Sequence, residues 1–168
     1  MKILLVSGGP SLTRQVTAAL PLDAEVLEVR TPQRALAVFD EGAQTFDAVL
    51  ADADTHPTGG FYLVRELRAR QTDGSAVPPT VVLLARPQDE YLARWSQTDA
   101  WIVKPVDPFD LSDVLGALVR GDPVPALPGV GTLGHPPVLG PGGGTNADRT
   151  VVGRTPRELE RPKGGGRD

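Results

Sequence analysis

The chain has 168 residues, a formal net charge of −4 and 40% hydrophobic residues, which is enough apolar material for one folded domain. It has no cysteine, which excludes disulfides, thiolate nucleophiles and cysteine-bound metals, and its two histidines lie far apart in the sequence. The chain has more acidic than basic residues, whereas nucleic-acid binders are typically basic. The first apolar run is too short for a signal peptide or a membrane span. We therefore expect a cytoplasmic protein that binds neither nucleic acid nor membranes.

Composition divides the chain at residue 120. Residues 121–168 hold 12 of the 19 glycines and 8 of the 17 prolines, whereas all eight aromatic residues lie in residues 1–120. Because frequent proline and glycine prevent a helix from propagating, we predict a folded domain over 1–120 and a disordered tail over 121–168. A short linear motif is expected around 150–161. There Thr150 and Thr155 stand among arginines and are candidate phosphorylation sites, although a simple solvated tail explains them as well.

Short apolar runs in the first 120 residues predict strands over 2–6, 25–29, 47–51, 80–85 and 100–103. Four of them are apolar at consecutive positions, as in parallel strands covered on both faces. The second run alternates valine or leucine with glutamate, which favours a strand at the edge of the sheet.

Segments with helical spacing separate these runs. The first has an apolar stripe beginning at Leu12. The second should begin at Thr31-Pro32, a cap followed by a proline at the first helical position, and end at Gly42. A third stripe contains Leu63 and Leu67, and a fourth covers 88–96 with Tyr91, Leu92 and Trp95. The last helix should begin after Asp107, and its Leu111, Val114, Leu115, Leu118 and Val119 should face the sheet. The alternation predicts an α/β fold with a doubly wound five-stranded parallel sheet.

Ligands of such sheets bind at the carboxyl ends of the strands, so the residues at those positions carry the functional information. Asp52 follows the third predicted strand, and Lys104-Pro105 follows the fifth. With Gly60 eight residues after Asp52, this pattern resembles the receiver domain of two-component response regulators, over the whole of residues 1–120. The resemblance implies a CheY-like (βα)5 fold of strand order 2-1-3-4-5. It places Asp52 at the phosphoacceptor position, Lys104 at the phosphate-contacting lysine and Trp101 at the aromatic switch position.

Four positions in three motifs depart from the receiver pattern. The two residues after the first strand, which are acidic in receivers and hold Mg²⁺, are Ser7 and Gly8. The Thr/Ser switch position at the end of the fourth strand is Leu84, and the proline of the loop after Asp52 is one position late, at Pro57. Because Mg²⁺ needs one or two protein carboxylates, Asp52 would be its main and insufficient ligand. We therefore expect a degenerate receiver with no cofactor or only weakened Mg²⁺ binding.

These observations lead us to expect a non-enzymatic single-domain response regulator that works as a protein–protein adaptor in two-component (phosphorelay) signal transduction. Its partner would be a histidine kinase or a downstream effector, and it could form a homodimer through its last strand and helix. One alternative is a conventional receiver that is phosphorylated at Asp52. Another is a flavodoxin-like small-ligand binder that uses the turn over Ser7–Ser11.

Two further groups of residues have both a functional and a purely structural explanation. Asp54 and His56 near Asp52 could bind a metal, but they are equally expected of a solvated loop. Trp95, Trp101 and Phe109 could anchor a partner, but ordinary core packing accounts for them at least as well.

Overall fold

The computed structural model describes residues 1–72, 74 and 76–134. The predicted linear motif and its two threonines, Thr150 and Thr155, lie outside the described residues. The described chain alternates strands and helices in the following order: β1 (Lys2–Val6), α1 (Pro10–Ala19), β2 (Glu25–Val29), α2 (Pro32–Glu41), β3 (Ala48–Asp52), α3 (Gly59–Thr72), β4 (Thr80–Leu84), the short 3₁₀ turn η1 (Pro87–Asp89), α4 (Glu90–Ser96), β5 (Ala100–Val103), α5 (Pro108–Arg120) and β6 (Val130–Thr132).

The helix ends follow the predicted caps. The hydroxyl of Thr31 accepts a hydrogen bond from the Arg34 amide (3.2 Å), and α2 ends at Gly42 in the left-handed conformation. At α5, the Asp107 carboxylate accepts from the amides of Phe109 and Asp110, which satisfies two donors that the first helical turn leaves free. These local signals confirm where the second and the last helix begin.

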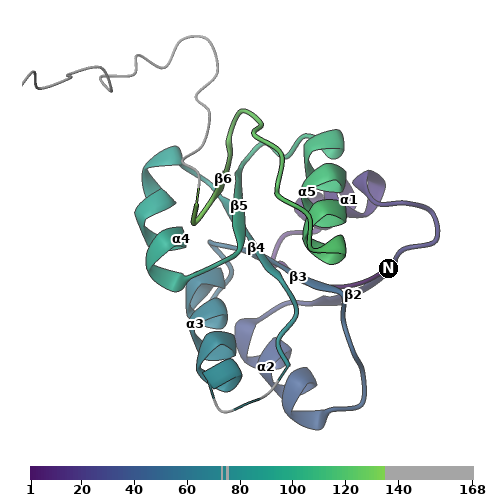
Figure 1. Ribbon diagram of the computed structural model, residues 1–168. Coiled ribbons are helices and arrows are strands. Elements are labelled where there is room, and N and C mark those ends of the chain that lie inside the picture. Colours follow the sequence, from purple (N-terminus) through teal and green to yellow (C-terminus); the bar gives the residue numbers. More distant parts are fainter. Residues whose placement is uncertain (73, 75, 135–168) are drawn as a thin grey trace, which may run out of the picture.

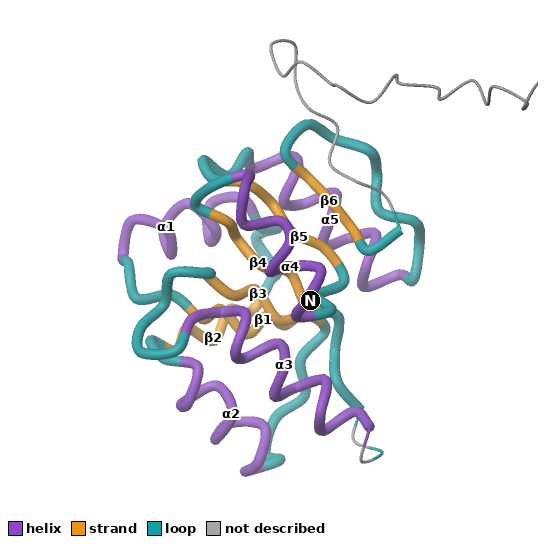
Figure 2. Tube along the Cα trace, turned by 90° about the vertical axis from the view of Figure 1, so that its left-hand side faces the viewer, coloured by secondary structure: helices purple, strands orange, loops and turns teal. Residues whose placement is uncertain are grey.

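The sheet has the order β2-β1-β3-β4-β5-β6, and its first five strands are parallel (Figure 1). Every residue of β3 and β4 is buried, while β2 lies at the edge and is half exposed, as its alternating sequence predicts. Helices α1 and α5 cover one face of the sheet, and α2, α3 and α4 cover the other (Figures 1 and 2). The predicted doubly wound architecture is therefore confirmed.

The predicted boundary at residue 120 is wrong. The chain continues from α5 back to the sheet, where Val130–Thr132 pairs with β5 as a sixth strand, antiparallel to its neighbour (Figure 1). Val130 is 4% exposed and packs in the core beneath α5. Sequence patterns missed this strand because three residues within a Pro/Gly-rich stretch show no periodicity. These residues form a strand because they pair with the free edge of β5.

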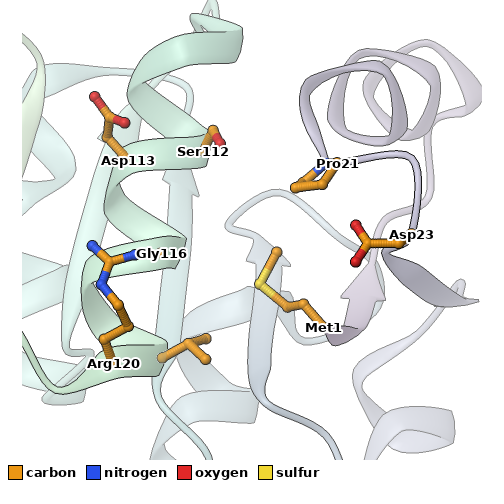
Figure 3. Close-up of a pocket in the computed structure, with 8 residues that line it drawn as sticks. Met1, Pro21, Asp23, Ser112, Asp113, Gly116 and Arg120 are labelled. Carbon is orange, nitrogen blue, oxygen red and sulfur yellow. The ribbon is translucent and has the colours of Figure 1, made fainter.

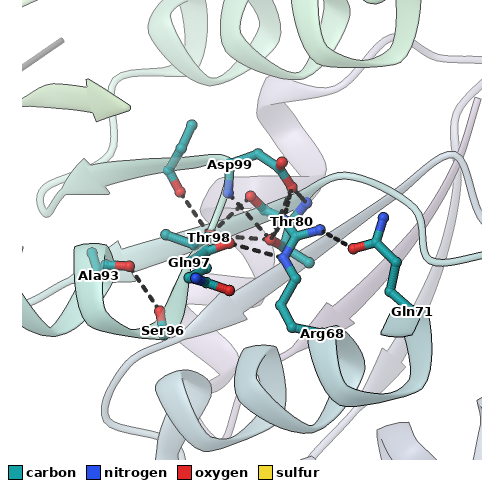
Figure 4. A network of polar contacts seen from close by, with 9 residues as sticks. Arg68, Gln71, Thr80, Ala93, Ser96, Gln97, Thr98 and Asp99 are labelled. Atoms are coloured by element: carbon teal, nitrogen blue, oxygen red, sulfur yellow. Dashed lines mark hydrogen bonds and ion pairs between the residues drawn. The ribbon is translucent and has the colours of Figure 1, made fainter. Parts of the chain in front are cut away.

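A polar network joins α3 to the strands at the amino end of β4 (Figure 4). The Arg68 guanidinium donates to the Asp99 carboxylate at 2.6 Å and to the carbonyl of Gln97 at 2.9 Å. Asp99 also accepts from the backbone amide of Thr80 at 2.7 Å. The network therefore fixes the loop before β5 against the start of β4. In the part of the chain that the structure describes, no helix combines the length and apolar character needed to cross a membrane.

Candidate functional site

The carboxyl ends of β1, β3 and β5 bring the predicted site residues together. The Lys104 ammonium donates to the Asp52 carboxylate at 2.8 Å and to the Asp54 carboxylate at 3.3 Å. The same Asp52 oxygen accepts from the backbone amide of Asp54 at 3.1 Å. The side chains of Asp52 and Lys104 are only 12% and 25% exposed. The structure thus places a partly buried ion pair where the sequence predicts the phosphoacceptor and lysine positions.

The charge of Lys104 is stabilised in this position. Burial by itself lowers the pKa of Lys104, but its hydrogen bond to Asp52 and the charges of Asp52 and Asp54 outweigh burial and raise the pKa above its ordinary value. Lys104 is therefore a permanent cation at neutral pH, and it neutralises the carboxylate that ends β3.

Backbone geometry at the start of α3 depends on two glycines. Gly59 has a positive φ of 81°, and a Cβ there would lie 2.7 Å from the Ala53 carbonyl oxygen. A Cβ at Gly60 would lie 2.8 Å from the Asp52 carbonyl oxygen. Only a residue without a side chain lets the helix begin this close to the end of β3. This explains in physical terms why the glycine eight residues after Asp52 accompanies the site.

A pocket of about 390 Å³ opens beside Asp52. Its walls include the Gly8-Gly9 turn after β1, the carboxylates of Asp52 and Asp54, and His56. Thr55 also lines it, as do Arg30 and Thr31, which follow β2. The sequence reasoning missed these two residues. Their position after an edge strand is the one signal that could have drawn attention to them.

The residues at this pocket do not fit the Mg²⁺ ion that receivers hold. The hydroxyl of the buried Ser7 is bonded within its own turn, to the amide and the carbonyl of Gly9, and Gly8 has no side chain. Both nearby carboxylates already bond to Lys104. Across residues 1–72, 74 and 76–134, no three histidine or acidic side chains are grouped so that they could hold a metal ion.

The two predicted switch positions lie in one apolar cluster. Leu84 and Trp101 are both fully buried and pack with Ala53, Val64, Val82 and Ala93. Leu84 brings a hydrocarbon side chain, without a hydroxyl, to the end of β4. Three aromatic side chains on α4 and α5 point outward instead: Tyr91 is 66%, Trp95 60% and Phe109 80% exposed. Of Trp95, Trp101 and Phe109, core packing therefore explains only Trp101. The apolar stripe predicted for 88–96 is wrong at Tyr91 and Trp95, because α4 turns both toward solvent.

A second pocket, of about 350 Å³, lies at the opposite end of the strands (Figure 3). It is lined by Met1, Pro21 and Asp23 on one side and by α5 residues, among them Asp113 and Arg120, on the other. None of the predicted site residues within the described part of the chain lines it. Asp52 and Lys104 thus belong to a separate site.

The fold, with an aspartate at the end of β3 and a lysine directly after β5 at the same edge of the sheet, defines a CheY-like α/β protein. No protein-family model matches the chain. It is 32% identical over 110 residues to uncharacterized response regulatory proteins from two strains of Mycobacterium tuberculosis, a match that spans 66% of this chain and 78% of each relative. The chain belongs to the response-regulator receiver family.

Solved receiver structures share the fold at low sequence identity. A putative response regulator from Chloroflexus aurantiacus matches with a TM-score of 0.62 and 15% identity, over 71% of this chain and 97% of that one. The chemotaxis response regulator CheY4 of Vibrio cholerae matches with a TM-score of 0.56 and 24% identity, over 71% and 96%. The receiver domain of Saccharomyces cerevisiae Ssk1, solved with the histidine phosphotransfer protein Ypd1, matches with a TM-score of 0.60 and 16% identity, over 71% and 89%.

Proposed function

We propose that this receiver is a degenerate response regulator, which works as a protein–protein adaptor and takes up little or no phosphoryl group in a Mg²⁺-dependent reaction. The observation that carries the proposal is the shared ion pair: Lys104 contacts both Asp52 and Asp54, while Ser7 and Gly8 occupy the positions of the acidic pair. With no acidic residue directly after β1, Lys104 is the cation that neutralises Asp52.

The chemistry of phosphoryl transfer supports this proposal. Such transfer depends on positioning and on neutralising the charge of the phosphoryl oxygens, and the metal is a major source of that neutralisation. In this chain, Lys104 is the cation bonded to Asp52, and one oxygen of Asp52 is held by both Lys104 and the Asp54 amide. An attack by Asp52 would have to break or weaken these contacts.

The switch position supports the same reading. A hydroxyl at position 84 would bond to a phosphoryl oxygen, and a hydrogen bond to a charged group contributes about 1.5–3 kcal/mol. Leu84 cannot make this bond, and its side chain is committed to the apolar cluster around Trp101. A phosphoryl group at Asp52 would therefore be poorly coupled to the rest of the fold.

The partner would be a histidine kinase or a downstream effector, bound by docking. The likeness to the Ssk1 receiver, which was solved in complex with a histidine phosphotransfer protein, supports a signalling protein as the partner class. Exposed aromatic side chains favour interfaces, and Tyr91, Trp95 and Phe109 provide them on α4 and α5. A homodimer through the last strand and helix would have to use these helices, because β6 occupies the outer edge of β5.

The test is intact-mass measurement after incubation with acetyl phosphate and Mg²⁺. We expect little or no added phosphoryl on the wild-type protein and none on Asp52→Asn. Gly8→Asp restores one carboxylate at a position with open space around it, and should increase labelling. Stoichiometric, Mg²⁺-dependent labelling of the wild-type protein at Asp52 would instead establish the conventional receiver.

A further inference from the structure

The outer edge of β5 is covered by the short strand β6. β6 pairs with β5 in antiparallel register, with Trp101 opposite Gly131 and Ile102 opposite Val130. The Val103 amide donates to the Gly129 carbonyl at 2.8 Å. All other strand pairs of the described sheet are parallel. The strand β6 is thus an added occupant of an edge that would otherwise be open.

Gly131 fits this edge because it has no side chain. A Cβ at Gly131 would collide with the indole ring of Trp101, which lies against it. By contrast, Gly134 has open space around it. Trp101 thus sets a requirement for its cross-strand neighbour that only glycine meets.

Arg94 on α4 completes the enclosure of Trp101. Its guanidinium lies 5.0 Å from the centre of the indole ring, in a cation–π arrangement. The same group donates to Glu90 at 2.8 Å and to the carbonyl of Leu133 at 3.4 Å. One side chain therefore connects α4, the buried indole and the residue that follows β6.

The closed arrangement leaves one polar group unsatisfied. The indole Nε1 of Trp101 is the single buried side-chain nitrogen or oxygen without a hydrogen-bond partner among the described residues. Burying an N–H donor without an acceptor costs free energy, which exposure to water or another backbone arrangement would recover. The burial of the Trp101 N–H therefore costs free energy that opposes the pairing of β6 with β5.

The segment before β6 is held by few backbone hydrogen bonds. It contains Pro123, Pro125 and Pro128, which have no backbone N–H to donate. Its partly buried Val124 and Leu127 pack against the core cluster, and β6 itself is three residues long. Release of β6 would therefore break a short ladder and leave the five parallel strands intact.

We propose that the outer edge of β5 is a strand-binding site, which the chain's own residues 129–132 fill, and that an extended segment of a partner protein replaces them. The partner segment would carry glycine opposite Trp101, an apolar residue opposite Ile102 and a small or β-branched residue opposite Ala100, where Thr132 now lies. Main-chain hydrogen bonds would supply affinity, and the glycine requirement would supply selectivity.

Covalent linkage gives the resident segment an advantage. A tethered segment has an effective concentration on the order of millimolar, so a free peptide competes poorly until β6 is weakened. The inference deepens the proposed docking role and rests on it only for the existence of a partner. It does not involve Asp52, so phosphorylation of Asp52 could be found without affecting it.

The experiment uses the full-length chain with Trp95→Phe, which leaves Trp101 as the only tryptophan. Gly131→Ala is compared with the matched control Gly134→Ala. Acrylamide quenching of Trp101 fluorescence reports closure, and anisotropy reports binding of a labelled peptide of residues 125–134. We expect Gly131→Ala to raise quenching several-fold and to bind the peptide saturably. Gly134→Ala should behave as the Trp95→Phe parent, protected and without measurable binding.

A second peptide tests selectivity. Replacement of its glycine at position 131 by valine should abolish binding to the Gly131→Ala protein. The proposal is overturned if Trp101 is equally protected in both variants, if the opened protein binds neither peptide, or if it binds both equally. If Gly131→Ala loses its helical circular-dichroism signal, Arg94→Met is used in its place, and the same quenching and peptide-binding outcomes support or overturn the proposal.

Discussion

Removal of Lys104 should destabilise the fold more than neutralisation of Asp52, because Lys104 serves two carboxylates. Lys104→Met leaves Asp52 and Asp54 without their shared cation. Asp52→Asn leaves Lys104 bonded to Asp54 at 3.3 Å and keeps an oxygen for the Asp54 amide. The two substitutions delete the same 2.8 Å contact but leave different charges behind.

The contacts of Lys104 set the size of the expected losses in the free energy of unfolding. A hydrogen bond to a charged group contributes about 1.5–3 kcal/mol, and the Lys104–Asp52 bond lies in a region where water reaches only 25% and 12% of the two side chains. The Lys104–Asp54 contact is worth about 0–1 kcal/mol because the Asp54 side chain is 62% exposed. We expect a loss of about 2–3 kcal/mol for Lys104→Met and about 1 kcal/mol for Asp52→Asn, and a coupling of about 1–2 kcal/mol in the double-mutant cycle.

The assay is urea unfolding at pH 7, analysed for the free energy of unfolding in water. Lys2→Met is the matched control, since Lys2 lies 3.6 Å from Glu25 in a pair whose side chains are 35% and 74% exposed. It should change stability by less than about 0.5 kcal/mol. The reasoning is refuted if Lys104→Met is no more harmful than Lys2→Met, or if Asp52→Asn is the more damaging of the two site variants.

Three further predictions follow from the described contacts. Gly60→Ala should lower the free energy of unfolding by about 1–3 kcal/mol, because the new Cβ would press on the carbonyl oxygen at the end of β3, whereas Gly8→Ala, in open space, should change it by less than about 0.5 kcal/mol. Equal effects in chemical denaturation would contradict the crowding argument. Asp99→Asn should cost about 1–3 kcal/mol by the same measurement, since it weakens the charged network at the start of β4, and an unchanged midpoint would show that the network contributes nothing. Because folding raises the pKa of Lys104, the stability that Lys104 provides should be constant from pH 7 to its ordinary pKa of 10.5 and should decline as the pH rises through the higher pKa of the folded state. The difference in free energy of unfolding between wild type and Lys104→Met should therefore shrink only in strong alkali. A difference that has already disappeared at neutral pH would refute this prediction.

Much of the site could be predicted from the sequence because it depends on strand ends. Asp52 and Lys104 are 52 residues apart, yet each directly ends or follows an apolar run, and parallel strands bring their carboxyl ends to one edge of the sheet. The caps at Thr31 and Asp107 are likewise local, since a cap bonds to amides within three residues. The bonding of Lys104 to Asp54 as well as Asp52 emerged only from the folded loop.

The fate of the tryptophans could not be predicted from the sequence. Trp95 lies in the predicted helical stripe over 88–96 and Trp101 in the predicted strand over 100–103, but Trp101 is fully buried and Trp95 is 60% exposed. The difference depends on how α4 is rotated on the sheet, where Arg65 covers Trp95 and Arg94 covers Trp101. Rotation of a short helix is set by its neighbours in space, which periodicity over seven residues does not specify.

The sequence by itself determined the five βα units, the caps that begin the second and last helices, and the meeting of Asp52 with Lys104. These features follow from short-range patterns and from the geometry of parallel strands. Only the tertiary structure decided that Val130–Thr132 is a strand. Those three residues have no pattern of their own, and they become extended because β5 offers open hydrogen-bonding groups and Trp101 accepts only a glycine beside it.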